Sequence, residues 1–208
     1  MVYPQKNKLI HWFFHHYILR IIGRNFHAVQ FDRLSVPGDK AVLLLANHFS
    51  WWDGFLMYYL NHKLIGKKFH IMILEDTVRR VSFFKYMGAF SINKNSRDII
   101  QTINYAAELL HDPQNLVLIF PQGKLYSNFV DKVNFEKGVL RIMEQAQDKF
   151  RLVFSATFIQ YLKHKKPTAT VYLKGIDESL ACKNIDELAQ AYQQHYDSAK
   201  QRETEIIL

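Results

Sequence analysis

The sequence predicts a single α/β domain in which a mixed, mostly parallel β-sheet is flanked by helices. Its 208 residues are the length of one domain, and 49% of them are apolar, which is enough for a hydrophobic core. Short apolar runs, typical of strands buried on both faces, alternate from residue 41 onward with stretches of helical periodicity. We divide the chain into an N-terminal helical region, residues 1–30, and the α/β domain, residues 31–208.

The N-terminal region is expected to contain an amphipathic helix over residues 9–22. Bulky apolar and aromatic side chains dominate this segment, but Arg20 and three histidines interrupt it. It is also shorter than the ~20 residues that a membrane-spanning helix needs. One interpretation is a helix in a membrane interface; the other is a helix packed on the domain, and both can hold for different faces. The cations available to anionic headgroups are Lys6, Lys8, Arg20 and Arg24.

The first part of the domain contains three expected strands and two expected helices. Residues 41–46 (AVLLLA) form a continuous apolar run, as expected for a strand buried on both faces. Residues 54–60 have helical character, and residues 69–74 (FHIMIL) are expected to be the second strand. Residues 77–87 are expected to form a helix that a glycine ends, and residues 89–92 a short strand.

The second part continues the alternation. Residues 96–110 carry apolar side chains at a period of about 3.6, which indicates an amphipathic helix, and an Asp-Pro pair ends it. Residues 116–120 (LVLIF) are the next buried strand. The last helix is expected to begin at Asn184, because Glu187 completes a capping-box pattern. The other expected elements are a helix at residues 135–146 and extended segments at residues 152–162 and 168–173.

The charge balance favours an anionic partner. Twenty-seven Lys and Arg against 19 Asp and Glu give a net charge of +8 and a pI of about 9.4. This excess suits a membrane surface, a phosphorylated substrate or a nucleic acid. Aromatic residues reach 14%, which together with the positive charge is typical of a membrane-interface protein. The single cysteine, Cys182, excludes an internal disulfide and a multi-cysteine zinc site, and fits a reducing compartment.

Two motifs lie where the chain leaves expected strands, which is the edge at which α/β sheets bind ligands. The first is NHFSWWD at residues 47–53. At this spacing Asp53 can orient the ring of His48, which then acts as a general base on a hydroxyl group. The spacing alone is weak evidence, because His27 and Asp32 repeat it away from any expected strand end.

The second motif follows the fourth expected strand and combines a Pro-Gly turn with a lysine. Backbone N–H groups in such a turn can bind an anion, and the lysine adds positive charge. The alternative is a plain turn that reverses the chain. The motif consists of Phe120, Pro121, Gln122, Gly123 and Lys124.

Together the two motifs resemble the lysophospholipid acyltransferase family, which includes glycerol-3-phosphate and 1-acylglycerol-3-phosphate acyltransferases. Four blocks in the family's order carry the resemblance, which spans about residues 40–160. They are Asn47, His48 and Asp53; residues 88–94 (GAFSINK); residues 120–123 (FPQG); and residues 135–138 (FEKG).

The resemblance implies a glycerol-3-phosphate acyltransferase-like fold and a role in phospholipid biosynthesis. It implies transfer of a fatty acyl group from acyl-CoA or acyl carrier protein to a hydroxyl of a lysophospholipid or related lipid. His48 is then the general base, Asp53 orients it, and no metal or other cofactor is needed. Backbone N–H groups near Gly123 are expected to stabilise the oxyanion, and the turn to bind substrate. The lysines expected to meet donor or acceptor phosphates are Lys94, Lys124 and Lys137.

The sequence departs from the family pattern at three places. Gln122 stands where the family has Glu, but an amide still accepts and donates hydrogen bonds. Lys94 stands where the family has Arg, so a point charge replaces a planar fork unless Arg97 substitutes for it. A proline expected near Ser155 is absent. These changes concern the acceptor's polar head more than acyl transfer, so the sequence leaves the acceptor open.

An apolar run surrounds the base and has two interpretations. It is either an aromatic wall that receives the acyl chain or meets the bilayer, or the packing face of the following helix. Its members are Trp51, Trp52, Phe55, Met57, Tyr58 and Tyr59.

The alternative function is that of a catalytically inactive, membrane-bound, lipid-binding relative. Gln122 and Lys94 motivate it, whereas the presence of both His48 and Asp53 favours an enzyme. Nucleic-acid binding is not expected, because no standard motif is present and the positive charge is dispersed. The resemblance implies a peripheral or monotopic protein on the cytoplasmic face of the cell membrane. Acyl donor, chain length and oligomeric state stay open.

Overall fold

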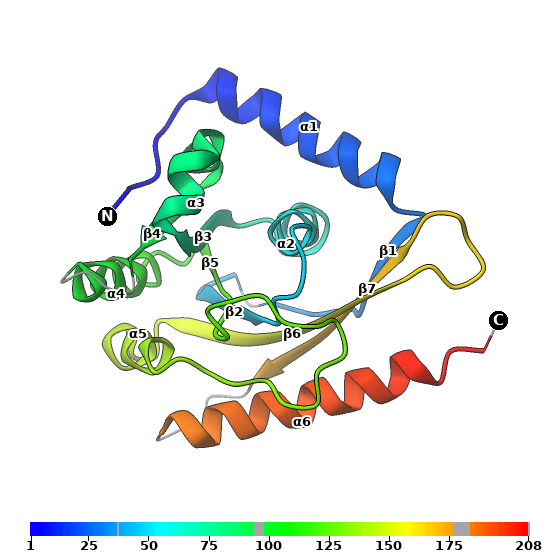
Figure 1. Ribbon diagram of the computed structural model, residues 1–208. Helices are drawn as coiled ribbons and strands as arrows, with labels where there is room; N and C mark the ends of the chain where they lie inside the picture. Colours follow the sequence, from blue (N-terminus) through cyan, green and yellow to red (C-terminus); the bar gives the residue numbers. More distant parts are fainter. Residues whose placement is uncertain (37, 94–97, 177–183, 208) are drawn as a thin grey trace.

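A computed structural model describes residues 1–36, 38–93, 98–176 and 184–207 of the chain. Seven strands form one mixed sheet in the order β1-β7-β6-β2-β5-β3-β4, flanked by helices on both faces (Figure 1). The predicted fold class is therefore confirmed. The strands are β1 (Ala28–Phe31), β2 (Ala41–Ala46), β3 (Lys68–Leu74), β4 (Ala89–Ile92), β5 (Asn115–Ile119), β6 (Phe150–Gln160) and β7 (Thr168–Ile176). The helices are α1 (Lys8–Asn25), α2 (Asp53–Leu60), the π-helix η1 (Asn61–Ile65), α3 (Glu75–Arg80), the 3₁₀-helix η2 (Ser82–Met87), α4 (Ile99–Leu109), α5 (Gly138–Ala146) and α6 (Ile185–Thr204).

The central strand β2 is fully buried, as its continuous apolar run predicts. It pairs in parallel with β5 on one side and β6 on the other, and no residue of it is more than 1% exposed. The pairs β3–β5, β3–β4 and β1–β7 are also parallel, and only β6–β7 is antiparallel among the described strands. Because β2, β3, β4 and β5 run in one direction, the loops that follow them gather at one edge of the sheet.

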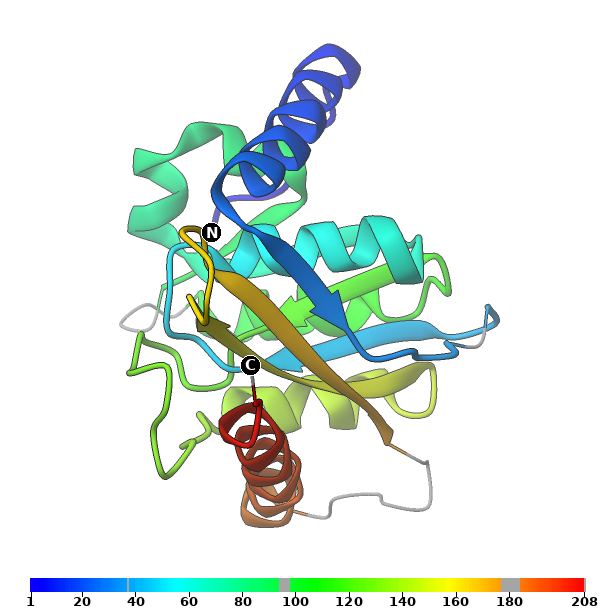
Figure 2. The same ribbon diagram turned by 90° about the vertical axis from the view of Figure 1, so that its right-hand side faces the viewer.

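Each face of the sheet is covered by its own hydrophobic cluster. Helices α1 and α2 pack with η2 on one face, where Ile22 and Phe55 belong to the same buried cluster as Leu44 of the sheet. Helices α4, α5 and α6 cover the other face, with Ile103 and Tyr192 in the second cluster. Figure 2 shows this three-layer arrangement from the side. The sheet is thus buried on both faces, as parallel strands require.

Helix α1 presents one face to the domain and one to the surroundings. Ile18 and Ile22 are each 2% exposed, whereas Leu9, Trp12 and Phe13 are 80%, 62% and 57% exposed. The packing interpretation therefore holds for the inner face only. None of the helices formed by the described residues combines the length and apolarity that crossing a membrane requires.

A partly buried polar contact connects α1 to α2. The Nδ1 atom of His15 lies 2.9 Å from the hydroxyl of Tyr58. Burial raises the pKa of Tyr58 to about 12, so at neutral pH the hydroxyl keeps its proton and can donate it. Burial, followed by the neighbouring His62, lowers the pKa of His15, which favours the neutral imidazole as acceptor.

Two elements differ from the sequence-based expectation. Strand β1 was not expected, because its four partly exposed residues do not form a continuous apolar run. It is a strand because it pairs with β7. The single helix expected over residues 77–87 is wrong, because α3 and η2 are separated at Val81. Beyond this break, Phe83 stacks on Phe14 of α1 with ring centroids 4.0 Å apart, a tertiary contact that local periodicity does not reveal.

Two predicted helix ends are confirmed. Gly88 ends η2 with a φ of +88°, a left-handed conformation that favours glycine. Asn184 caps α6: its side-chain oxygen accepts a hydrogen bond from the Glu187 N–H at 2.9 Å, and its amide donates to the Glu187 carboxylate. The first of these bonds is the N-cap bond of a capping box, and the second joins the two side chains.

Candidate active site

The loop after β2 is fixed to the neighbouring strand by Asn47. The Asn47 side chain is 4% exposed and exchanges two hydrogen bonds with the backbone of Thr157 in β6, at 2.8 and 2.9 Å. An amide is suited to this task because it donates and accepts at once. The pair holds the start of the loop rigidly, so that the next residue, His48, leaves the sheet at a defined point.

His48 and Asp53 form the pair that the sequence predicts. The Nδ1 atom of His48 lies 2.8 Å from Oδ2 of Asp53, and the two side chains are 27% and 3% exposed. The His48 ring stacks on Phe120, with centroids 4.2 Å apart and planes 13° apart. The two predicted motifs, separated by about 70 residues of chain, therefore meet at this ring.

The backbone at the start of α2 holds the Asp53 carboxylate. Its Oδ2 atom also accepts hydrogen bonds from the N–H groups of Phe49 at 2.7 Å and Ser50 at 2.9 Å. An ionised carboxylate only accepts, so the His48 Nδ1 carries the proton and Nε2 has the lone pair. This is the tautomer that a general base requires.

Gln122 has a role that sequence reasoning missed. It is 4% exposed, it does not line the adjacent cavity, and its Oε1 accepts a hydrogen bond from the His48 backbone N–H at 2.6 Å. The geometry therefore does not place Gln122 in contact with substrate. The neutral amide instead fastens the turn after β5 to the base.

The turn around Gly123 is made by its own backbone. Gly123 has a φ of +66°, and its N–H donates to the carbonyl of Phe120 at 3.1 Å. This N–H group is engaged within the turn, which removes it as a donor to an oxyanion. Two hydrogen bonds between residues farther apart in the sequence also hold the turn in place. The Tyr126 N–H donates to the His48 carbonyl, and the Glu136 N–H donates to the Pro121 carbonyl.

A cavity of about 620 Å³ opens beside the His48 ring. It extends over the ends of β3 and β5 to the inner faces of α4 and α5, so most of its wall is aliphatic. Phe120, Pro121, Gly123 and Lys124 of the predicted turn line it. The aliphatic part of the wall includes Ile71, Ile73, Ile103, Ile119, Val139 and Ile142.

The cationic side chains at this cavity differ from the predicted ones. Lys124 lines it as expected, and Arg80 of α3 joins it. Lys137 is exposed and is not among the lining residues, and Lys94 and Arg97 lie outside the described residues. No motif indicates Arg80; it reaches the site only because α3 lies at the wall of the cavity.

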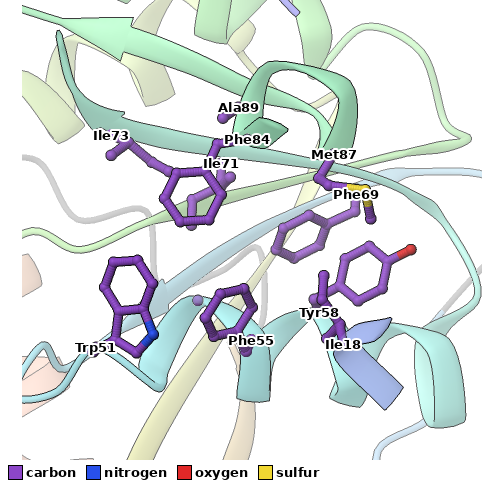
Figure 3. Close-up of a pocket in the computed structure, with 11 residues that line it drawn as sticks. Ile18, Trp51, Phe55, Tyr58, Phe69, Ile71, Ile73, Phe84, Met87 and Ala89 are labelled. Atoms are coloured by element: carbon purple, nitrogen blue, oxygen red, sulfur yellow. The ribbon is translucent and has the colours of Figure 1, made fainter. Parts of the chain in front are cut away.

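A smaller apolar pocket of about 50 Å³ adjoins the cavity (Figure 3). The two share Trp51, Gly54, Ile71, Ile73 and Phe84 in their walls. Figure 3 shows aromatic side chains of α2 facing those of β3 and η2 across it. Phe55 and Tyr58 are buried, as the packing interpretation of the aromatic run expects, whereas Trp51 is 56% exposed and stays available to the other interpretation.

Comparisons with known proteins agree with this geometry. The family model described as Acyltransferase matches residues 29–159. No curated protein is similar enough in sequence to match the chain. Among solved structures, the chain is similar to the crystal structure of the 1-acyl-sn-glycerophosphate (LPA) acyltransferase PlsC from Thermotoga maritima. That match has a TM-score of 0.64 and 16% identity, and it covers 97% of this chain and 80% of that chain.

Proposed function

The chain belongs to the acyltransferase family, and on this premise we propose that it transfers a fatty acyl group from a thioester to a hydroxyl of a lipid acceptor. The observation that carries the proposal is the His48–Asp53 pair at the wall of a largely aliphatic cavity. The donor is acyl-CoA or acyl carrier protein, and the acceptor a lysophospholipid or a related lipid. We propose that the reaction between them requires no resident cofactor.

The proposed chemistry is a base-assisted acyl transfer. The Nε2 atom of His48 takes the proton of the acceptor hydroxyl as its oxygen attacks the thioester carbonyl carbon. Asp53 stabilises the imidazolium that forms. The tetrahedral intermediate then collapses, the C–S bond breaks, and the proton passes from His48 to the leaving sulfur. An ester and a free thiol are the products.

The cavity walls support an acyl chain next to a phosphorylated group. The aliphatic wall contributed by β3, α4 and α5 suits a hydrocarbon chain, and the pocket in Figure 3 offers an apolar continuation. Arg80 and Lys124 are the cations that line the cavity within the described part of the chain, and we assign them to phosphates of the donor or acceptor.

We further propose that the protein attaches to the cytoplasmic face of the cell membrane without crossing it. The exposed Leu9, Trp12 and Phe13 on the outer face of α1 support this attachment. Side chains of this kind lie favourably at the boundary between headgroups and acyl chains.

A lipid-binding relative without activity is the second candidate, favoured by the loss of the family's carboxylate at Gln122. Its hydrogen bond to the His48 backbone counts against that reading, because a neutral acceptor still holds the base. An inactive protein would bind acyl donor and lipid without releasing thiol.

The test uses purified protein with acyl-CoA and acyl carrier protein donors and a panel of lysolipids and hydroxylated lipids. Thiol release and acylated lipid are both followed. We expect acceptor-dependent transfer, and at least a ~10²-fold loss in His48→Ala, because the general base is removed. His111→Ala is the matched control, since His111 is exposed in the turn before β5, far from the cavity lining. Undiminished transfer by His48→Ala would exclude the proposed base.

A further inference from the structure

Two long stretches of the sequence contain no acidic residue. The chain has 19 Asp and Glu, yet none lies within residues 1–31 or residues 149–176. The first stretch includes α1, and the second includes β6, the turn after it and the whole of β7. We name the turn segment 161–166 (YLKHKK) the basic turn; its cations are Lys163, Lys165 and Lys166.

The fold brings these two stretches side by side. Strands β1 and β7 pair in parallel, with Ala28 opposite Thr168. At the same end, the rings of His27 and His164 stack with centroids 3.5 Å apart, and the His27 N–H donates to the Pro167 carbonyl at 2.8 Å. Figures 1 and 2 show the basic turn beside the C-terminal end of α1. The basic turn thus lies beside the end of α1 whose last turn carries Arg24.

The basic turn projects beyond the edge of the sheet that carries the base. Strand β2 ends at Ala46, which pairs with Ser155 of β6, and β6 continues from there to Gln160. The turn therefore lies past the point where the chain leaves β2 for His48. A surface in contact with the turn is on the same side of the molecule as the mouth of the site.

The composition of this surface matches a lipid interface. Tyr161 at the start of the basic turn is 62% exposed, and Lys163, Lys165 and Lys166 are exposed beside it. Aromatic side chains at headgroup level with cations beside them are the pattern of proteins that bind anionic bilayers. A folded acidic protein would use the cations, but the exposed Leu9, Trp12 and Phe13 of α1 have the composition of a helix that lies in a membrane interface.

Acidic groups near this surface are neutralised or covered. Asp32, directly after β1, forms an ion pair with Arg202 at 3.2 Å. Glu203 is 2% exposed and accepts hydrogen bonds from Gln160 and Tyr172. Neither carboxylate therefore offsets the attraction of the basic turn for an anionic partner.

We propose that the outer face of α1 and the basic turn form one surface that binds an anionic lipid bilayer. The exposed apolar and aromatic side chains of α1 enter the interface, and the lysines of the turn contact anionic headgroups. The inference rests on the membrane attachment proposed above and deepens it, because it adds the basic turn to the docking surface and specifies the charge of the lipid. It predicts selectivity for anionic over zwitterionic lipid.

The test measures binding of the full chain to phosphatidylcholine vesicles with and without phosphatidylglycerol, in the absence of substrates. The test variant is K163Q/K165Q/K166Q. The matched control is K63Q/K68Q/K149Q, which removes the same charge at exposed positions near the opposite ends of β3 and β6. Lys149 belongs to the second acid-free stretch, so the control separates position in the fold from position in the sequence. Thermal unfolding of all variants checks that they fold.

We expect the basic-turn variant to lose ~10²-fold in affinity for the anionic vesicles, since three lysines near the surface each contribute about fivefold. The control should change by no more than a few fold. Trp12→Ala with Phe13→Ala should weaken binding to both vesicle types, because it removes insertion and not charge. Equal losses in the test and control triple variants would overturn the proposal. The proposal would also be overturned if the basic-turn variant kept its affinity for vesicles but lost binding to an acidic carrier protein. Because no turnover is measured, this outcome is independent of the proposed reaction.

Discussion

At the scale of single residues, the site is organised around one oxygen atom. Oδ2 of Asp53 accepts hydrogen bonds from His48, Phe49 and Ser50, and two of these donors are backbone groups. The carboxylate is therefore held in place by the loop itself, whether or not His48 is protonated. A base whose partner is fixed in advance loses little free energy to reorganisation when the proton moves.

Asp53→Asn should remove this control over the tautomer. The amide has one acceptor atom for the backbone donors, and its NH₂ group facing His48 Nδ1 would favour the proton on Nε2. We expect kcat to fall ~10²–10⁴-fold with KM nearly unchanged, measured by thiol release at saturating acceptor. Retention of full kcat would show that His48 needs no carboxylate.

Gln122 gives a paired prediction about the hydrogen bond to the base. Gln122→Leu leaves the His48 N–H without an acceptor and should cost ~1–3 kcal/mol of unfolding free energy together with activity. Gln122→Glu keeps an acceptor for this N–H group. Its unfolding free energy and activity should therefore fall less than those of Gln122→Leu, as measured by urea titration and thiol release. Equal losses in the two variants would contradict this placement of Gln122.

At the scale of elements, α2 and β3 together limit the apolar space near the base. Gly54 lines both pockets, and a Cβ atom there would lie 3.3 Å from the Cδ1 atom of Ile71. Because that atom is the movable end of a side chain, alanine fits after a small shift, whereas a larger side chain fills the junction.

Gly54→Leu should therefore shift donor preference toward shorter acyl chains. The measurement is kcat/KM over a series of acyl-CoA chain lengths, with Gly54→Ala as the conservative control. We expect the long-chain donors to lose at least ~10-fold relative to the short ones, since a few buried methylenes are displaced. A uniform loss at all chain lengths would show that the junction does not receive the acyl chain.

The passage from η2 to β4 gives a stability prediction. Gly88 has a φ of +88°, and a Cβ atom there would lie 1.9 Å from the carbonyl oxygen of Phe69, a backbone atom that cannot move aside. Gly66 also has a positive φ, +74°, but nothing lies within 4 Å of its Cβ position. Gly88→Ala should lower the unfolding free energy by ~3 kcal/mol or more, and Gly66→Ala by only ~1–2 kcal/mol, in urea titrations. Similar losses in the two variants would contradict the proposed clash.

At the scale of the whole molecule, α6 closes the sheet face opposite α1 with a buried imidazole. The Nε2–H group of His195 donates to the Tyr172 carbonyl at 3.1 Å, and burial lowers the pKa of His195 to about 4. Burial also lowers the pKa of His70 in β3. Both histidines are therefore harder to protonate in the folded protein than in the unfolded chain.

Acidification should consequently destabilise the fold. As pH falls below 6.5, His195 takes up a proton in the unfolded chain, whereas in the folded protein it does so only near pH 4. The unfolding free energy therefore decreases over this range. His195 contributes about 3 kcal/mol to that decrease, by the conversion of a pKa shift to free energy. His195→Gln keeps a donor for Tyr172 and should remove this part of the slope. A variant with the wild-type slope would show that His195 is protonated in the fold.

The layered α/β fold and the His48–Asp53 contact could both be predicted from the sequence alone. Buried strands such as β2 have to be apolar throughout, and the ends of parallel strands meet at one edge, so residues 47–53 and 120–124 could be placed together in advance. The capping box at Asn184 is likewise local, because its bonds span three residues. Short-range periodicity and strand-end chemistry contain this information.

The contacts that depend on packing between distant segments could not be predicted from the sequence. Strand β1 exists because β7 offers it a partner, and α3 separates from η2 beside the stack of Phe83 on Phe14. The position of Arg80 at the cavity and the burial of Gln122 against His48 have no local signature either. The physical reason is common to all of them: a side chain's role is set by what lies opposite it, and that neighbour is chosen by the fold and not by the adjacent sequence.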